Sequence, residues 1–366
     1  MPALGLLLLP ALLAACAGTP APSDKAEPGT PPPAAEGPKE PGKAKIDTSK
    51  YGIFYPQFWE MSEEGPLIPA LEEGNIPQGI AYWKEKGWLI ISNYKDDKSP
   101  STLMVVDAAI GEPVKKINLA EPGGSSYTGH AGGVAISGKH LWVSSEGKAW
   151  WMTLQSLADA KDGDKVEFGG VVSTVARASF TSFKDGVLWV GEFHLEPDYK
   201  TDASHKLTSP DGSKYGAWAV GYKLDPETDQ IPISQPGPVT PDYILSIPDR
   251  VQGFTMTTDS IITSQSYGRG NDSKLTMYRR PDLSTQPHQT VAIGDREVPV
   301  WFLDSKTLAG NLHTLTAPPM AEGVDTDGED RLFLLFESGA NKYRPTAASP
   351  MDTIRIIHLD KWRSSQ

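Results

Sequence analysis

The sequence predicts an all-β fold, a β-propeller of five blades, with six blades as the alternative. Three observations predict it: a unit of two short apolar strands recurs five times, a third apolar strand follows each unit, and long helical periodicity is missing. Strand repeats joined by turns at intervals of tens of residues are typical of propellers. The five units begin at Pro77, His130, Ala178, Val251 and Ala321.

The remaining strands and turns follow from the same repeat. Each third strand is apolar, and these strands begin near Ser101, Ala149, Ala217, Ser273 and Thr353. A glycine near the start of four units is expected where the innermost strand of one blade crowds the next blade, at Gly79, Gly133, Gly253 and Gly323. The stretch REVPVWFLD within residues 286–316 is a candidate for part of a sixth blade. Residues 51–60 are apolar and aromatic, and we expect them to form the strand or wrap that closes the ring.

The first sixteen residues carry a different signal. An apolar run from Leu6 to Leu13 ends in Leu-Ala-Ala-Cys at Cys16, and it is too short to span a bilayer. The tetrad resembles a bacterial lipobox, which implies a lipoprotein-type signal peptide over residues 1–16 and lipid attachment at Cys16. A plain secretory signal with an incidental cysteine is the alternative. Cys16 is the only cysteine in the chain, which excludes disulfides and a cysteine nucleophile from the folded body.

Residues 17–46 are rich in Pro, Ala, Gly, Lys and Glu and predict a disordered tether. Their charges cancel, so the net charge of −12 falls on the predicted propeller domain, residues 47–366. Such an acidic body is a poor partner for nucleic acid. We expect a monomer that meets the membrane only through its lipid, held on the bacterial cell envelope and facing the periplasm or the cell surface, or else a secreted protein.

Hairpin geometry predicts where a site would lie. The residue that opens the first strand and the residues that end the second lie on one side of an antiparallel pair. Across the five units these positions are mostly polar or acidic, and we expect them to surround the axis as a funnel. The candidate ligand-binding residues are Gln78, His130, Glu192, Gln252, Gln265, Tyr267 and Arg269.

The repeat pattern resembles blades of the NHL type and of gluconolactonases and paraoxonases. From Pro77 to Asp360 the chain is also similar to secreted bacterial propeller proteins of no assigned activity, through phrases such as PQGIAY, GHAGG, QSYGR and FESGANKY. The resemblance to the calcium-dependent enzymes implies metal ligands just before the glycine of each innermost strand, which would be Glu322, Gln78 and Gln252. Two amides and one carboxylate supply few of the six to eight oxygens that calcium takes.

Glu322 and Glu337 bracket one hairpin and would face the funnel together, so they are candidate catalytic residues for acid and base work, as in glycoside cleavage. A coordinating or structural role is the alternative. Along EFHLEPD, Glu192, His194, Glu196 and Asp198 alternate and would share one face of an extended strand, a spacing that suits a metal. Pro197 indicates an irregular segment and favours an exposed charged rim instead. The stretch DTDGED at residues 325–330 is interpreted as a tight hairpin turn, because its glycine comes too early for an EF-hand loop.

Three functions fit these residues. The first is an envelope-anchored propeller that binds a small molecule or a glycan in its axial funnel, with no catalysis required. The second is a metal-dependent hydrolase or lyase, of calcium type, that acts on a lactone or glycan. The third is a scaffold for protein–protein interaction. Whether the protein is an enzyme is left open by the sequence.

Overall fold

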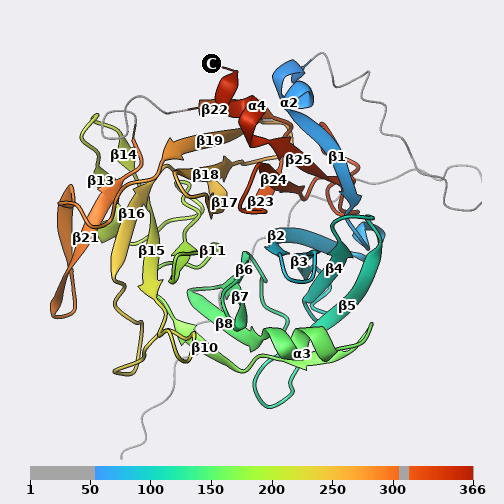
Figure 1. The fold of residues 1–366 in the computed structure, drawn as a ribbon, viewed down its shortest axis with the longest axis horizontal. Helices are drawn as coiled ribbons and strands as arrows, with labels where there is room; N and C mark the ends of the chain where they lie inside the picture. The colour runs from blue at the N-terminus through green and yellow to red at the C-terminus, as the bar shows by residue number, and fades with distance from the viewer. Residues whose placement is uncertain (1–53, 305–312, 366) are drawn as a thin grey trace, which may run out of the picture. The chain divides into compact units, whose positions relative to one another are not determined.

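The structure is a computed structural model that describes residues 54–304 and 313–365. The predicted signal peptide, Cys16 and the predicted tether lie outside these residues. Across the described ranges, five mainly antiparallel sheets are arranged as blades around one axis (Figure 1). The chain is therefore a five-bladed β-propeller, as the repeat predicts.

Each blade is built outward from the axis by consecutive strands. The first blade contains β2 (Asn75–Trp83), β3 (Trp88–Lys95), β4 (Thr102–Asp107) and β5 (Pro113–Ala120), with β9 (Lys165–Glu167) parallel to β5 at its outer edge. The second contains β6 (Val134–Ile136), β7 (His140–Ser145), β8 (Lys148–Thr153) and β10 (Gly170–Ser173). The fourth contains β17 (Val251–Met256), β18 (Ser260–Gln265), β19 (Ser273–Arg279) and β22 (His313–Ala317).

The third blade is the largest and explains the candidate sixth blade. It contains β11 (Phe180–Lys184), β12 (Val187–Gly191), β15 (Ala217–Lys223) and β16 (Tyr243–Ile247), and a later hairpin of β20 (Gln289–Ile293) and β21 (Arg296–Phe302) extends it. Strand β21 pairs in parallel with β16 through Ile244 and Val300. The REVPVWFLD stretch thus widens the third blade and does not begin a sixth.

The fifth blade joins the two ends of the described chain. It contains β23 (Ala321–Thr326), β24 (Arg331–Phe336) and β25 (Thr353–His358), and β1 (Ser62–Leu67) pairs with β25 as the outermost strand. The predicted closing segment packs on this last blade as a wrap and not as a strand, since residues 56–61 form the helix α2 (Pro56–Met61) and the closing strand follows it. Pro56 suits the first turn of a helix, and Phe58 packs edge-on against Phe336. Residues 51–53 lie outside the described ranges.

Short elements complete the fold. They are the 3-10 helices η1 (Leu71–Glu73) and η2 (Ala203–His205), the helices α3 (Leu154–Asp159) and α4 (Leu359–Ser364), and the small hairpin of β13 (Leu207–Thr208) and β14 (Lys214–Tyr215). None of the helices in the described residues has the length and apolar character needed to cross a membrane. The core lies between adjacent blades, where Trp142, Trp189 and Trp218 are fully buried.

The innermost strands β2, β6, β11, β17 and β23 contact one another in ring order around the axis. The glycines of these strands allow the close approach that the sequence predicts. A Cβ atom on Gly133 would lie 2.2 Å from the backbone nitrogen of Thr181, and one on Gly253 would lie 2.5 Å from the carbonyl oxygen of Glu322. A side chain at either position would clash with backbone that has no room to move.

Candidate functional site: the axial cavity

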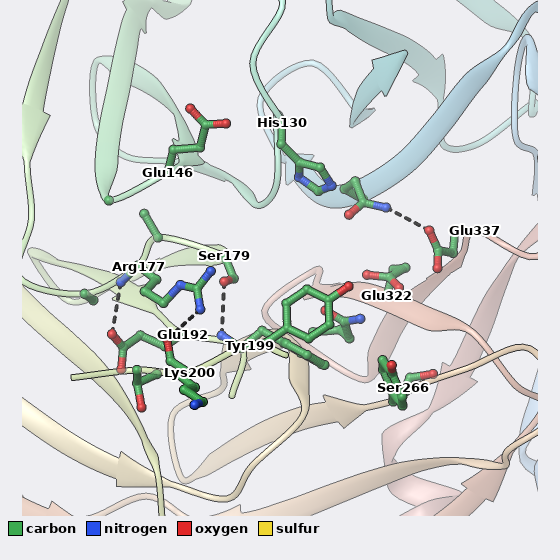
Figure 2. Close-up of a pocket in the computed structure, with 18 of the residues that line it drawn as sticks. His130, Glu146, Arg177, Ser179, Glu192, Tyr199, Lys200, Ser266, Glu322 and Glu337 are labelled. Carbon is green, nitrogen blue, oxygen red and sulfur yellow. Dashed lines mark hydrogen bonds between the residues drawn. The ribbon is translucent and has the colours of Figure 1, made fainter. Parts of the chain in front are cut away.

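A cavity of about 1060 Å³ opens at the end of the axis where the first strands begin and the second strands end. Figure 2 shows residues of several blades converging on it. The hairpin geometry therefore places the polar positions of the repeats around one space, as predicted. The predicted residues that line it are Gln78, His130, Glu192, Gln252, Tyr267, Arg269, Glu322 and Glu337.

Irregular pairing in three innermost strands accompanies the residues that line the cavity. In β2, Pro77 pairs with Asn93 and Gly79 pairs with Ser92, so Gln78 is an extra residue in the ladder. Gln252 is an extra residue of the same kind in β17, and the register of β23 shifts across Glu322. A β-bulge re-aims a side chain that would otherwise alternate with its neighbours. The bulges are thus the local reason that these three side chains line the cavity.

Glu322 and Glu337 lie against each other on the fifth blade, and their side chains form a hydrogen bond. Glu322 is 3% exposed. Burial, followed by the negative charge of Glu337, raises the pKa of Glu322 well above its ordinary value, and burial also raises the pKa of Glu337 to about 7. At neutral pH the pair therefore holds a proton on Glu322, which donates it toward Glu337.

The rest of this hydrogen-bond network bears on the predicted calcium site. The side-chain amide of Gln78 donates to Glu337 Oε2 at 3.1 Å and to its neighbour's carbonyl, so its nitrogen faces the carboxylate. Within residues 54–304 and 313–365, no group of three or more His, Cys, Asp or Glu side chains is placed to hold a metal ion. The predicted ligands Glu322, Gln78 and Gln252 line the cavity together with Glu337, and they supply two carboxyl groups and two amides of the six to eight oxygens that calcium takes. The calcium site stays a prediction.

Aromatic and basic side chains cover the rim beside this pair. Tyr94 stacks on His130 with ring centroids 4.1 Å apart, and its hydroxyl lies 3.1 Å from that of Tyr343. The Lys342 ammonium lies over both tyrosine rings, and the Arg269 guanidinium lies 5.1 Å from the Tyr343 centroid. The pKa of His130 is lowered, because the side chains packed around its ring disfavour the charged form. The rim thus offers a neutral imidazole and cations in fixed positions.

The opposite wall comes from the third blade, and Figure 2 shows Glu192, Arg177 and Lys200 there. Glu192 is 1% exposed and accepts hydrogen bonds from the backbone N–H groups of Arg177 and Trp218, each at 3.1 Å. His205 Nδ1 lies 2.9 Å from Glu192 Oε2. The sequence analysis missed His205. The signal that could have found it is the long insertion between the second and third strands of this repeat, residues 192–216.

Two predictions about this region are wrong. The predicted exposed rim holds for Glu196 and Asp198 but is wrong for Glu192 and His194, which are 1% and 3% exposed. Residues of the insertion bond to both, His205 to Glu192 and Thr201 to His194. Gln265 does not line the cavity, because its side-chain amide donates to the carbonyl oxygen of Asp249 at 2.9 Å. The next residue, Ser266, lines the cavity in its place. Successive side chains of a strand point to opposite faces, so a shift of one residue exchanges them.

Elsewhere the turn interpretation is confirmed. Residues 325 and 326 end β23, and residues 327–330 join it to β24, with Gly328 at a φ of 84°. Asp327 accepts hydrogen bonds from the backbone N–H groups of Glu329 and Arg331 at this turn. Residues 325–328 line a smaller pocket of about 160 Å³, and no residue of the turn lines the axial cavity.

Fold and site together define a class, a five-bladed β-propeller with a polar axial cavity. No protein-family model and no curated protein matches the sequence. Solved structures similar to the chain include a glutaminyl cyclase of Myxococcus xanthus, at 15% identity and a TM-score of 0.36, over 80% of this chain and 94% of that one. A putative glucose dehydrogenase from a Thermus species is similar at 12% identity and a TM-score of 0.38, over 81% of this chain and 98% of that one. A gluconolactonase of Xanthomonas campestris is similar at 12% identity and a TM-score of 0.35, over 81% of this chain and 95% of that one. The likeness concerns propeller architecture and does not extend to activity.

Proposed function

We propose that the protein binds a small hydroxylated molecule or a glycan in its axial cavity, through Glu322 and Glu337. The observation that carries the proposal is the buried carboxyl pair that shares a proton in the cavity wall. Holding two carboxyl groups together in a buried place opposes folding, and groups with such displaced pKa values gather at functional sites. A structural role for the pair would not require an open cavity beside it.

The chemistry of the pair suits hydroxyl groups. A protonated carboxyl donates one hydrogen bond, a carboxylate accepts several, and a sugar hydroxyl does both. The rings of Tyr199 and Tyr267 are 43% and 37% exposed and lie 6.2 Å apart, so they offer apolar faces near the mouth. A ligand with hydroxyl groups and a ring would use both features.

The test compares wild type with an E322Q/E337Q variant. A glycan array of neutral and acidic oligosaccharides identifies the strongest ligand, which is then titrated calorimetrically. We expect the double variant to lose binding by tenfold or more, because Gln cannot share the proton. The matched control is E329Q, an exposed glutamate outside the cavity that pairs with Lys84, and it should bind as wild type. Equal binding by wild type and the double variant would show that the ligand does not bind through the carboxyl pair.

We further propose that Cys16 is lipid-modified and that residues 17–46 tether the propeller to the bacterial cell envelope, with the body monomeric and the lipid its only membrane contact. The support is the Leu-Ala-Ala-Cys tetrad after an apolar run and the spacer composition that follows. Cells grown with a radioactive fatty acid should label the wild-type protein and not a C16S variant. Unlabelled wild-type protein in the medium would support the secreted alternative instead.

A further inference from the structure

The wall opposite the carboxyl pair holds a second group of titratable side chains that the proposed binding function does not use. His205 ends the short helix η2, and its ring stacks on Trp218 with centroids 3.7 Å apart and planes 20° apart. Its Nδ1 lies 3.1 Å and 2.9 Å from the two oxygens of Glu192. The carboxylate and the stacking together hold the ring in one orientation, so its Nε2 points in a single direction.

That nitrogen is open to the cavity. His205 is 5% exposed and lines the axial cavity, and its Nε2 forms no hydrogen bond with any described part of the chain. It is also not among the described polar atoms that are sealed from solvent without a partner. The Glu192 carboxylate is itself held by two backbone N–H groups, so its position does not depend on a ligand. The buried, oriented imidazole therefore presents one unpartnered nitrogen to the same space as Glu322.

We propose that Glu192 and His205 form a catalytic dyad in the axial cavity, in which His205 Nε2 takes a proton from water that attacks an ester of a small molecule. Glu192 is a positioning residue, because it reaches the substrate only through the imidazole. A carboxylate on Nδ1 fixes the tautomer that leaves Nε2 able to accept a proton and stabilises the imidazolium that forms. The dyad adds an activity to the cavity and does not depend on the sugar binding proposed above.

The charges on this wall favour an ester over a glycoside. Arg177 donates through Nη1 to the carbonyl oxygen of Lys200 at 2.7 Å, and neither cation forms a salt bridge with a carboxylate among the described residues. Attack on an ester builds negative charge on the carbonyl oxygen, which cations stabilise. Glycoside cleavage builds positive charge on the sugar ring, which cations oppose. Asp202 is the other acidic residue that lines this side of the cavity.

The atoms of the step balance without a further reagent. Water oxygen bonds to the carbonyl carbon while His205 Nε2 accepts its proton, and the carbonyl electron pair moves to oxygen. When that pair returns, the acyl–oxygen bond breaks, and the departing alkoxide takes the proton from the imidazolium. The products are a carboxylic acid and an alcohol, and His205 is neutral again.

A chemical probe tests the exposed nitrogen in the wild-type protein. Diethyl pyrocarbonate modifies neutral imidazole nitrogens, and peptide mass spectrometry locates each product. We expect a product at His205 at a rate within tenfold of that at His130, whose exposed ring lines the rim of the same cavity. Absence of a product at His205 while His130 reacts would show that its Nε2 is closed and would overturn the dyad.

A kinetic experiment tests the catalysis, with p-nitrophenyl acetate as the probe. H205N keeps a donor toward Glu192 and removes Nε2, so kcat/KM should fall about 100-fold or more. H140N is the matched control and should stay within twofold of wild type, because His140 is also 5% exposed and bonded through Nδ1 to Asp229 but lies outside the cavity. E192Q should lower kcat about tenfold or more and leave KM within twofold of wild type, because the ring loses the carboxylate that orients it while the cavity walls stay in place. Wild-type hydrolysis no faster than that of H205N, or an unchanged kcat in E192Q, would refute the proposal.

Discussion

Glu322 and Glu337 form a side-chain hydrogen bond with each other at the wall of the axial cavity, and Gln78 from the neighbouring blade donates to Glu337. The three residues come from the last and first blades, which are adjacent only because the ring closes. The site is therefore assembled only when the propeller closes. Strand β1 completes the fifth blade at its outer edge and so contributes to this closure.

The carboxyl pair should make stability depend on pH. Burial raises the pKa of Glu337 from 4.5 to about 7. Between these values the folded protein keeps protons on Glu337 and Glu322 that the unfolded chain has lost, so the free energy of unfolding should fall as pH rises from about 4.5 to 7. It should go on falling above pH 7, because Glu322 still keeps its proton. The share of Glu337 alone should be on the order of 3 kcal/mol, measured by urea unfolding with tryptophan fluorescence at several pH values.

The control separates the pair from other carboxyl groups. E322Q/E337Q should flatten this dependence, while E146Q, at an exposed position of the cavity rim, should leave it in place. The same slope in the double variant would assign the effect to other groups. Asp325 is one such group, since burial raises its pKa to about 6.

Asp325 should be a link between blades. One of its oxygens accepts from the backbone N–H of Tyr82 at 2.8 Å, and the other accepts from the Thr255 hydroxyl at 3.0 Å. In D325N an amide nitrogen, which cannot accept a hydrogen bond, replaces one of the two oxygens. One of the two donors, the Tyr82 N–H or the Thr255 hydroxyl, therefore loses its partner. We expect a loss of about 1–3 kcal/mol in the free energy of unfolding at pH 8. The exposed D295N should change it by less than about 0.5 kcal/mol, and equal effects would count against the link.

We expect the glycines of the innermost strands not to tolerate substitution even by alanine. In G133A the new Cβ would lie 2.2 Å from the Thr181 nitrogen, so adjacent blades must separate. Overpacking of this kind should destabilise the protein by about 2 kcal/mol or more in urea unfolding. G270A is the matched control, because a Cβ at Gly270 meets no atom within 4 Å. Comparable stability of the two variants would contradict the close approach.

The blades could be predicted from sequence because each repeat carries its own pattern. Apolar strands, turns and the glycine at Gly133 are local signals, and they also located the cavity positions such as Glu322. Strand β1 escaped because SEEGPL is polar and contains Gly and Pro, which an outer strand tolerates but a strand pattern does not reveal. Its partner β25 lies almost the whole chain away.

The details of the site depended on features that periodicity does not record. A bulge at Gln78 shifts the alternation of side chains by one residue, and the same kind of one-residue error placed Gln265 in the cavity instead of Ser266. His205 lies in an insertion with no counterpart in the other repeats, so no repeat position pointed to it. Its role depends on Trp218 and Glu192, which fix its ring from two different strand ends.

We expect Lys115 to be required for the segment that contains α3 to pack on the first blade. Its side chain is 8% exposed, and its ammonium donates to the carbonyl oxygens of Leu157, Ala158 and Ala160, at 2.6, 3.0 and 2.8 Å, at the end of α3. Burial lowers its pKa, because the charged form is less well solvated there.

In K115M the three carbonyl groups lose their donor, while the aliphatic stem that packs between helix and blade is kept. We expect a loss of about 2–4 kcal/mol in the free energy of unfolding, measured in urea, since several acceptors lose a charged partner together. K165M is the matched control, because Lys165 is exposed and donates to a single carbonyl, that of Gly124. It should change stability by less than about 0.5 kcal/mol. If K115M changed the free energy of unfolding as little as K165M, water would have to replace the ammonium at all three oxygens. The packing of Leu157 alone would then hold α3 in place.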